Sequence, residues 1–262
     1  MRIAAAIVAG ALITLRLPAQ APSETAQREA RVILSEMVTI NTAQLRGDVT
    51  PLATELAERF VKAGVPAADV QLVGPGAKNR NLVVRIRGKN SAKPVLFLAH
   101  LDVVDANRSD WSMEPFSVTE KDGWFYGRGT ADDKGPATTL VAGMLALVRS
   151  KATPTRDIIL ALTSGEESAD TSGAAWLVMN RKDLVSADWV FNFDAGGPSI
   201  DNGKLAWVEL QGSEKVYWTV TLTTHNAGGH SSLPRPDNAI YQLTSAIRDV
   251  ESLNCPIHLT DI

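Results

Sequence analysis

Three short apolar segments constrain the fold of this 262-residue chain more than any other feature. The segments PVLFLA (94–99), DIILALT (157–163) and DWVFNF (188–193) lack a regular alternation of apolar and polar residues. Such segments are typical of strands that are covered on both faces, as in a parallel sheet. Segments with apolar residues at helical spacing, 134–148 and 171–184, follow the first two of them. Strands that alternate with helices predict an α/β layer fold with a mostly parallel sheet.

Two further helices and a strand are expected before these segments. Apolar residues at helical spacing predict a helix within 23–40. A second helix opens at Thr50-Pro51, with Thr50 as its N-cap, and closes at Gly64. The β-rich sequence NLVVRIRG predicts a strand over 81–88.

The sequence pattern changes after about Gly212. The segment VYWTVTLTT (216–224) alternates like a half-buried antiparallel strand, and DNAIYQLTSAIRDVESL (237–253) is typical of an amphipathic helix. We therefore expect a main domain over 22–211 and an incomplete, smaller α+β domain over 212–262.

The N-terminus has the pattern of an export signal. Met1-Arg2 is positively charged, residues 3–15 are apolar, and Ala19 and Ala21 form a small-x-small cleavage pattern. We expect residues 1–21 to be a signal peptide, which makes the protein secreted or periplasmic. The apolar run is short for a membrane span, so no stable anchor is expected after cleavage. The alternative is an uncleaved N-terminal helix.

Composition excludes two classes of protein. The chain has 26 Lys and Arg against 29 Asp and Glu, a net charge of −3, so no basic surplus exists to neutralise the phosphates of nucleic acid. Its single cysteine, Cys255, cannot form an internal disulfide framework.

Polar residues stand at the ends of the predicted strands. In an open α/β sheet, ligands gather outside the carboxyl ends of the strands. Each residue alone is typical of a helix cap, a turn or a solvated loop, but their joint occurrence at successive strand ends indicates a site. The strand-end residues are His100 and Asp102, Glu166 and Glu167, and Asp194, and Asp132 and Asp133 precede the helix over 134–148.

This set of residues favours a metal site. Carboxylates so close together repel one another unless a cation lies among them. Histidine with Asp and Glu, and without cysteine, suits zinc, with manganese or cobalt as substitutes. Asp102 is placed to accept the second imidazole N–H of His100 and so to orient the ring.

Five motifs, in this order and spacing, resemble the dizinc aminoacylase and carboxypeptidase family. They are HLDVV, GRGTADDKGP, SGEES, DAGG and GGHSSLP, between His100 and Asn238. This family includes acetylornithine deacetylase, succinyl-diaminopimelate desuccinylase and carnosine dipeptidase. The resemblance implies a zinc-peptidase catalytic domain followed by a lid, or dimerisation, domain.

The resemblance also implies a role for each site residue. His100, Asp132 and Asp194 would bind one zinc ion, and Asp102 would orient His100. Asp132 would bridge to a second zinc ion, which Glu167 also binds, whereas Asp133 falls where the family varies. Glu166 would be the general base that takes a proton from the attacking water. His230, in the lid, would reach the substrate carbonyl, often across a dimer.

The resemblance stops before the family's last metal-binding histidine. The second zinc site is therefore short of one ligand, and we expect the chain to be part of a longer, homodimeric protein that is cut within the lid. His258 lies right after the lid helix, where a surface histidine is the simpler interpretation, although a ligand role is the alternative. His225 is expected to be a strand-end or hairpin residue.

The expected function is metal-dependent cleavage of amide bonds in small peptides. The tryptophan-rich segment DWSMEPFSVTEKDGWFYGRGT (110–130) looks closer to the peptidase and carboxypeptidase branches than to the deacylases. The alternatives are an N-acyl-amino-acid deacylase of the same family and an inactive metal-binding remnant. A nucleotide-binding domain fits poorly, because GRGTADDKG has carboxylates where phosphates would lie.

Overall fold

A computed structural model describes residues 22–43, 47–167, 172–194, 197–209, 218–230 and 232–256. They belong to two compact units, Met1–Ala195 and Gly196–Ile262, which are described here one by one. The predicted signal peptide 1–21 and His258 lie outside the described residues. Among the helices of the described ranges, none is both long and apolar enough to cross a membrane.

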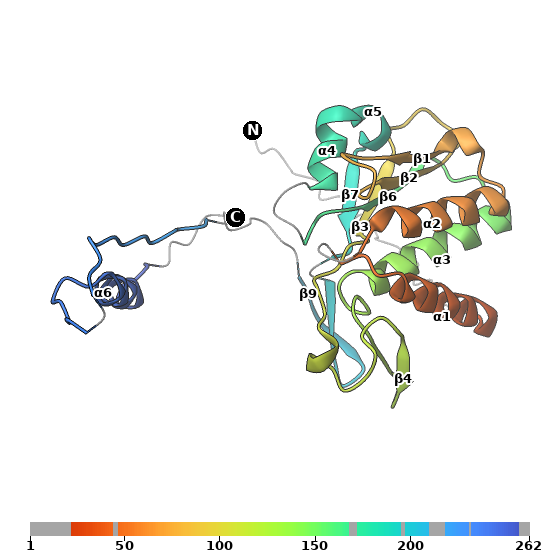
Figure 1. Ribbon diagram of the computed structural model, residues 1–262. Coiled ribbons are helices and arrows are strands. Elements are labelled where there is room, and N and C mark those ends of the chain that lie inside the picture. Colours follow the sequence, from red (N-terminus) through yellow and green to blue (C-terminus); the bar gives the residue numbers. More distant parts are fainter. Residues whose placement is uncertain are drawn as a thin grey trace, which may run out of the picture. The chain divides into compact units, whose positions relative to one another are not determined.

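The first unit alternates strands with helices, as the sequence predicts (Figure 1). Its elements are α1 (Glu24–Thr39), α2 (Val49–Ala63), η1 (Ala67–Asp69), β1 (Val70–Val73), β2 (Asn81–Ile86), β3 (Val95–His100), η2 (Arg108–Asp110), β4 (Thr119–Lys121), β5 (Trp124–Tyr126), α3 (Lys134–Ser150), β6 (Ile158–Thr163), α4 (Gly173–Asn180), α5 (Lys182–Val185) and β7 (Trp189–Asn192).

The central sheet has five strands in the order β1-β2-β6-β3-β7. β3 pairs in parallel with both β6 and β7, whereas β2 pairs antiparallel with β6 and with β1. β2 is therefore the one strand of this sheet that runs opposite to the other four. The predicted α/β fold with a mostly parallel sheet is confirmed.

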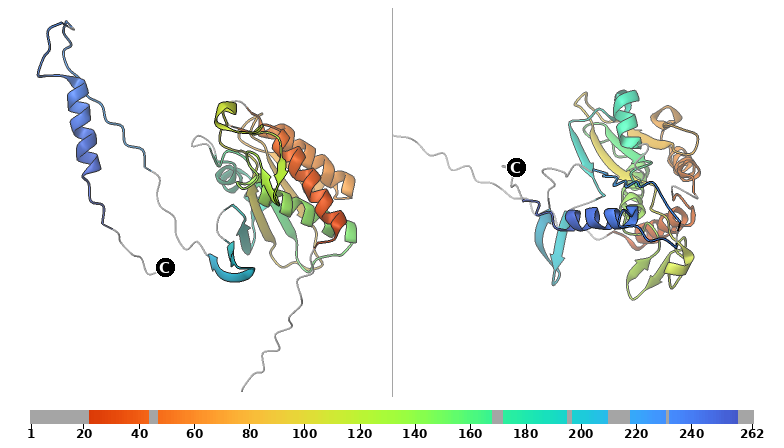
Figure 2. Two further views of the ribbon diagram at one scale, coloured as in Figure 1. Left: turned by 90° about the horizontal axis from the view of Figure 1, so that it is seen from below. Right: turned by 60° about the vertical axis from the view of Figure 1, so that its left-hand side comes forward.

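Helices cover both faces of this sheet. α1, α2 and α3 lie on one face and α4 and α5 on the other (Figures 1 and 2). Successive residues of β6 pack into different clusters, with Leu160 and Leu162 towards the first face and Ile159 and Ala161 towards the second. Burial on both faces explains why the strand sequence shows no alternation. At the edge strand β7 the side chains are exposed.

The start of α2 differs from the sequence prediction. α2 begins at Val49, and its N-cap is Asp48, whose carboxylate accepts the N–H of Thr50 at 2.8 Å. The predicted cap, Thr50, is wrong: its hydroxyl instead donates to the carbonyl oxygen of Ala77 at 2.7 Å. The end is as predicted, since Gly64 adopts a left-handed conformation with φ 109°.

The single helix predicted over 171–184 is also wrong. It is divided into α4 and α5 at Arg181, whose φ of −139° is outside the helical range. The N-cap of α4 is Ser172, whose hydroxyl accepts the N–H of Ala175.

The second unit contains β8 (Gly197–Asp201), β9 (Lys204–Glu209) and α6 (Ala239–Glu251). β8 and β9 form an antiparallel hairpin. The strand predicted over 216–224 is not found in its described part, 218–224, although the helix predicted over 237–253 is confirmed as α6. A strand needs a hydrogen-bonded neighbour, and alternation alone does not supply one. The boundary expected between residues 211 and 212 stays a prediction.

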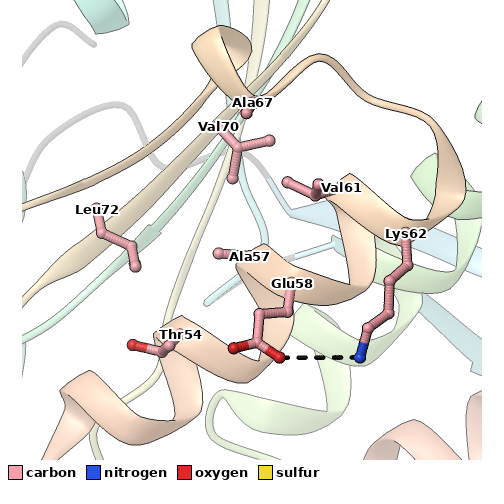
Figure 3. A pocket seen from close by; sticks show the side chains of 8 residues that line it. All are labelled: Thr54, Ala57, Glu58, Val61, Lys62, Ala67, Val70 and Leu72. Carbon is pink, nitrogen blue, oxygen red and sulfur yellow. Dashed lines mark ion pairs between the residues drawn. The ribbon is translucent and has the colours of Figure 1, made fainter.

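A shallow groove remains between α2 and β1 (Figure 3). It encloses about 410 Å³ and is mostly apolar, with Ala57, Val70 and Leu72 on its floor. Glu58 and Lys62 form an ion pair of 3.8 Å at its rim. The groove contains no histidine or cysteine and only this paired carboxylate, so it does not resemble a metal site.

Removal of a central core side chain should destabilise the first unit strongly. Leu160 is fully buried and lies between Val84 and Phe97 in the sheet. We expect Leu160→Ala to lower the free energy of unfolding by about 2–5 kcal/mol, because it leaves a cavity in rigid surroundings. Urea denaturation followed by circular dichroism measures this change.

The control is Val32→Ala on the exposed side of α1, where 52% of Val32 is exposed. That variant should change the free energy of unfolding by less than about 0.5 kcal/mol. Equal losses in the two variants would contradict the placement of Leu160 in the core.

Candidate metal centre

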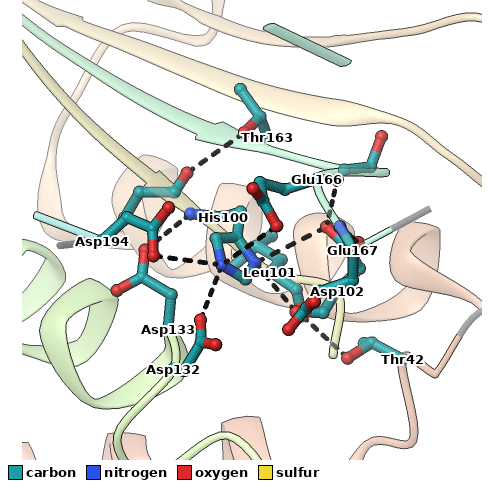
Figure 4. A network of polar contacts seen from close by, with 12 residues as sticks. Thr42, His100, Leu101, Asp102, Asp132, Asp133, Thr163, Glu166, Glu167 and Asp194 are labelled. Carbon is teal, nitrogen blue, oxygen red and sulfur yellow. Dashed lines mark hydrogen bonds and ion pairs between the residues drawn. The ribbon is translucent and has the colours of Figure 1, made fainter. Parts of the chain in front are cut away.

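The parallel strands β6, β3 and β7 bring their carboxyl ends to one edge of the sheet. His100 is the last residue of β3 and pairs with Thr163 at the end of β6. Glu166 and Glu167 follow β6, and Asp194 follows β7. Asp132 and Asp133 precede α3 directly. Figure 4 shows these side chains converging on the imidazole of His100.

The imidazole is buried and surrounded by carboxylates. Nε2 of His100 lies 2.9 Å from Oδ1 of Asp132, 3.8 Å from Oδ1 of Asp194 and 4.0 Å from Oε2 of Glu166, while 2% of the His100 side chain is exposed. In the described part of the chain, the ion pairs of these three carboxylates are all with His100. The cluster therefore concentrates negative charge around one imidazole.

Two groups of side chains could each hold a metal ion. They are His100 with Asp132 and Asp194, and His100 with Glu166 and Glu167, and the ligand atoms of each group lie within 4.8 Å of one another. One imidazole with several carboxylates is the donor set expected for zinc, manganese or cobalt. The residues present thus fit a divalent cation, and the structure brings together all four predicted metal ligands.

The orientation of His100 comes from a backbone group. Its Nδ1 lies 2.9 Å from the carbonyl oxygen of Asp102, which can only accept, so Nδ1 carries a proton and donates it. Asp102 thus accepts the imidazole N–H as predicted, but through its backbone carbonyl group and not through its carboxylate, which lies 3.7 Å from Nδ1. This arrangement leaves Nε2 facing the carboxylates, as a metal ligand requires.

The carboxylate of Asp102 instead holds the glutamate loop. Oδ1 accepts the backbone N–H of Glu166 at 3.2 Å, and Oδ2 accepts that of Glu167 at 3.0 Å. Asp102 is 3% exposed, so the accepting carboxylate is buried. Asp102 therefore links the end of β3 to the loop after β6, a contact that the sequence did not predict.

Sequence reasoning listed Asp133 among the polar residues of the site but gave it no role. It is fully buried, and its Oδ2 accepts the backbone N–H of His100 at 2.8 Å. Its Oδ1 is buried without a hydrogen-bond partner among the described residues. Burial raises the pKa of Asp133 to about 7, against the lowering effect of the hydrogen bond from His100. The one sequence signal was the position of Asp133 beside Asp132, directly before a helix.

The charges of the cluster shift several pKa values. Burial lowers the pKa of His100, but the negative charges of Asp102, Asp133 and Asp132 outweigh it, so the pKa is raised. Burial raises the pKa of Glu166, and the charge of Asp194 adds to this rise while His100 opposes it. Burial and the charge of Asp132 raise the pKa of Glu167. Burial is thus the main cause of the raised pKa values of Glu166 and Glu167, and the neighbouring carboxylates are the cause of the raised pKa of His100.

The predicted lid histidine, His230, belongs to the second unit and is exposed. Its Nδ1 accepts hydrogen bonds from the hydroxyl of Ser232 at 2.8 Å and from the N–H of Ser232 at 3.3 Å. The N–H can only donate, so Nδ1 is unprotonated and Nε2 carries the proton of the neutral ring. His225 is exposed in the same unit.

Comparison with known sequences gives two well-matched relatives. The chain is 33% identical over 171 residues to the human N-fatty-acyl-amino acid synthase/hydrolase PM20D1, a match that covers 64% of this chain and 34% of that protein. It is 33% identical over 186 residues to a probable succinyl-diaminopimelate desuccinylase of Staphylococcus epidermidis, covering 70% of this chain and 42% of that protein. The matches thus span less than half the length of either relative.

Two solved structures share the fold of this chain. The TM-score is 0.57 with the di-peptidase Dug1p of Saccharomyces cerevisiae, at 21% identity over 68% of this chain and 40% of that one. It is 0.53 with the M20 family metallo-carboxypeptidase Sso-CP2 of Sulfolobus solfataricus, at 24% identity over 64% of this chain and 38% of that one.

A family model agrees with the motifs that the sequence analysis singled out. It matches residues 96–256, from the second residue of β3 to beyond α6, and so includes every predicted site residue from His100 to His230. The resemblance stated from the sequence is thereby confirmed, and the chain belongs to the peptidase family M20/M25/M40.

Proposed function

We propose that this chain supplies the metal centre of a hydrolase that cleaves amide bonds in small peptides, in the manner of a carboxypeptidase or dipeptidase. The observation that carries the proposal is the convergence of His100, Asp132, Asp194, Glu166 and Glu167 at one sheet edge. Membership of a hydrolase family supports it.

The metal ligands divide between the two cations that we propose. His100, Asp132 and Asp194 would hold one zinc ion, and Asp132 and Glu167 would contribute to the second, with manganese or cobalt as substitutes. Bound zinc supplies Lewis acidity, which lowers the pKa of water and polarises a carbonyl oxygen.

Glu166 is the proposed general base. Its side chain is 52% exposed, so a water or a substrate can reach it, and its Oε2 lies 4.0 Å from Nε2 of His100. Glu166 would take the proton of the attacking water and pass it to the leaving amine. Asp102 would keep Glu166 and Glu167 in place through their backbone N–H groups.

His230 is the proposed donor to the substrate carbonyl. Ser232 leaves the proton on Nε2, so this nitrogen can donate a hydrogen bond to an oxygen that gains negative charge during the attack. We propose that a homodimer completes this arrangement. We also propose, from the pattern of residues 1–21, that the protein is secreted or periplasmic.

N-acyl amino acids are the second candidate class of substrate. The relatives named N-fatty-acyl-amino acid synthase/hydrolase are 33% identical in human, 33% in Xenopus tropicalis and 34% in Danio rerio. An amide bond between an acyl group and an amino acid requires the same general base as a peptide bond. A panel of dipeptides and N-acyl amino acids, assayed with added zinc, separates the two classes.

Glu166→Gln should keep the metal and lose the reaction. We expect turnover of the best substrate in the panel to fall by about 10²–10⁴-fold, because the amide cannot take a proton from water. Zinc content per chain, measured by elemental mass spectrometry, should stay at the wild-type value.

Two control variants test whether the loss of turnover without loss of zinc is specific to Glu166. Glu167→Gln should lower the zinc content, and Glu58→Gln, at the distant groove between α2 and β1, should change neither quantity. Undiminished turnover by Glu166→Gln would remove Glu166 from the mechanism. Wild-type protein that binds zinc but turns over no substrate would favour the inactive metal-binding remnant.

Zinc should stabilise the wild-type chain, because a cation relieves the repulsion among the carboxylates. At free zinc 100-fold above its Kd, we expect the free energy of unfolding to rise by about 2.7 kcal/mol. Thermal unfolding at increasing zinc concentration measures this effect. His100→Ala should abolish most of it, because His100 belongs to both groups of candidate ligands. A Tm that does not change with zinc concentration would refute the metal centre.

A further inference from the structure

Lys134 is a fully buried cation that the proposed mechanism does not use. It is the first residue of α3 and follows Asp132 and Asp133 directly. Its Nζ donates to the carbonyl oxygens of Met37 and Ile40, each at 2.8 Å. A buried ammonium is costly unless it is hydrogen-bonded, so these two contacts determine where Lys134 can lie.

The two carbonyl groups belong to the C-terminal end of α1. The last carbonyl groups of a helix lack partners within the helix, and the helix dipole makes this end negative. The last turn of α1 contains no basic residue, so its own sequence supplies no charge of the right sign. Lys134, which lies 97 residues beyond Met37 in the chain, supplies a hydrogen-bond donor to these carbonyl groups.

The segment that follows α1 also contacts the strand that carries His100. The hydroxyl of Thr42 donates to the carbonyl oxygen of Leu101 at 2.7 Å, and Ala43 forms a parallel bridge with Val103 (Figure 4 shows Thr42 beside Leu101 and Asp102). Residues 37–43 therefore contact two of the backbone segments that carry site residues, the segment before α3 through Lys134 and the end of β3 through Thr42.

The space for the Lys134 side chain is narrow. Gly129 has a φ of 90°, and a Cβ there would lie 2.9 Å from Cγ1 of Val103 and 3.1 Å from Cδ of Lys134. The aliphatic stem of Lys134 thus passes directly over a glycine that has room for no side chain. This close fit leaves little freedom to the backbone between Gly129 and Lys134, where Asp132 and Asp133 lie.

We propose that Lys134 is a positioning residue of the metal centre, which it serves by anchoring the Asp132–Asp133 backbone to the end of α1. The anchor keeps the carboxylate of Asp132 at Nε2 of His100, and that of Asp133 at the backbone N–H of His100. The part of this inference that concerns metal rests on the proposed function. The part that concerns the His100 backbone does not.

The test compares Lys134→Met with a matched variant on the same helix. Thr138 lies one turn further along α3, and its buried hydroxyl contacts Sδ of Met37 at 3.2 Å. Thr138→Val is therefore the matched variant. Both variants disturb the packing of α3 against α1. Only Lys134→Met removes the link between the Asp132–Asp133 backbone and the carbonyl groups of α1.

The first measurement needs no metal. Hydrogen exchange of the metal-free protein, followed by NMR, reports the His100 amide, and the Leu160 amide in the sheet centre reports global opening. Lys134→Met should make the His100 amide exchange about tenfold faster relative to Leu160, because its bond to Asp133 weakens. Thr138→Val should leave that ratio unchanged. An equal ratio of His100 exchange to Leu160 exchange in Lys134→Met and Thr138→Val would overturn the proposal.

The second measurement is zinc affinity, by competition with a chelator. Loss of a group that orients metal ligands typically weakens binding by about 10–100-fold, so we expect this loss for Lys134→Met and wild-type affinity for Thr138→Val. Wild-type zinc affinity in Lys134→Met would overturn the metal part of the inference. If the wild-type protein binds no zinc, the proposed function fails, while the exchange measurement still decides the role of Lys134.

If Lys134→Met does not fold, Lys134→Arg replaces it in both measurements. The guanidinium can still donate to backbone carbonyl groups, but it is planar and wider than the ammonium, so it cannot reproduce both contacts of Nζ with the same geometry. We expect it to fold, with faster exchange of the His100 amide and weaker zinc binding than in the wild type. Wild-type values of both quantities would show that the geometry of the lysine contact does not position the site.

Discussion

Repulsion among the carboxylates around His100 is the constraint on which the rest of this structure depends. Asp132, Asp194 and Glu166 lie within about 4 Å of one buried nitrogen, and burial together with the charges of neighbouring carboxylates raises the pKa values of Glu166 and Glu167. These carboxylate side chains would move apart if their backbone segments were not held in place. The fold therefore has to hold each backbone segment by other contacts, and three parallel strands that end at one edge provide the rigid base.

The strands and the ligands could be predicted because they follow from local sequence. Apolar runs without alternation identified β3, β6 and β7, and the rule that ligands gather at the carboxyl ends of strands linked His100 to Glu167 and Asp194. Neither step needs knowledge of the tertiary contacts. The resemblance to the M20 family added roles for these residues, but the convergence itself follows from the order of strands and charged residues along the chain.

Other features depend on contacts between distant segments, so the sequence could not specify them. Nothing in the motif HLD shows that the carboxylate of Asp102 accepts the backbone N–H groups of the glutamate loop, or that its carbonyl oxygen accepts the hydrogen bond of the imidazole. Likewise, Asp48 and Thr50 are both good N-caps, and the carbonyl group of Ala77, far along the chain, decides between them. Alternation over 216–224 predicted a strand, but a strand also depends on a neighbour.

The same reasoning explains why buried polar groups surround this site. Asp102, Asp133 and Lys134 are almost fully buried, a position that charged side chains seldom occupy. Each one holds backbone groups of another segment: Asp102 those of Glu166 and Glu167, Asp133 that of His100, and Lys134 those of Met37 and Ile40. Apolar residues of similar size would pack as well, but they could not fix the backbone at these points. The buried charged residues next to the candidate ligands therefore hold the backbone segments that bring these carboxylates together against their own repulsion.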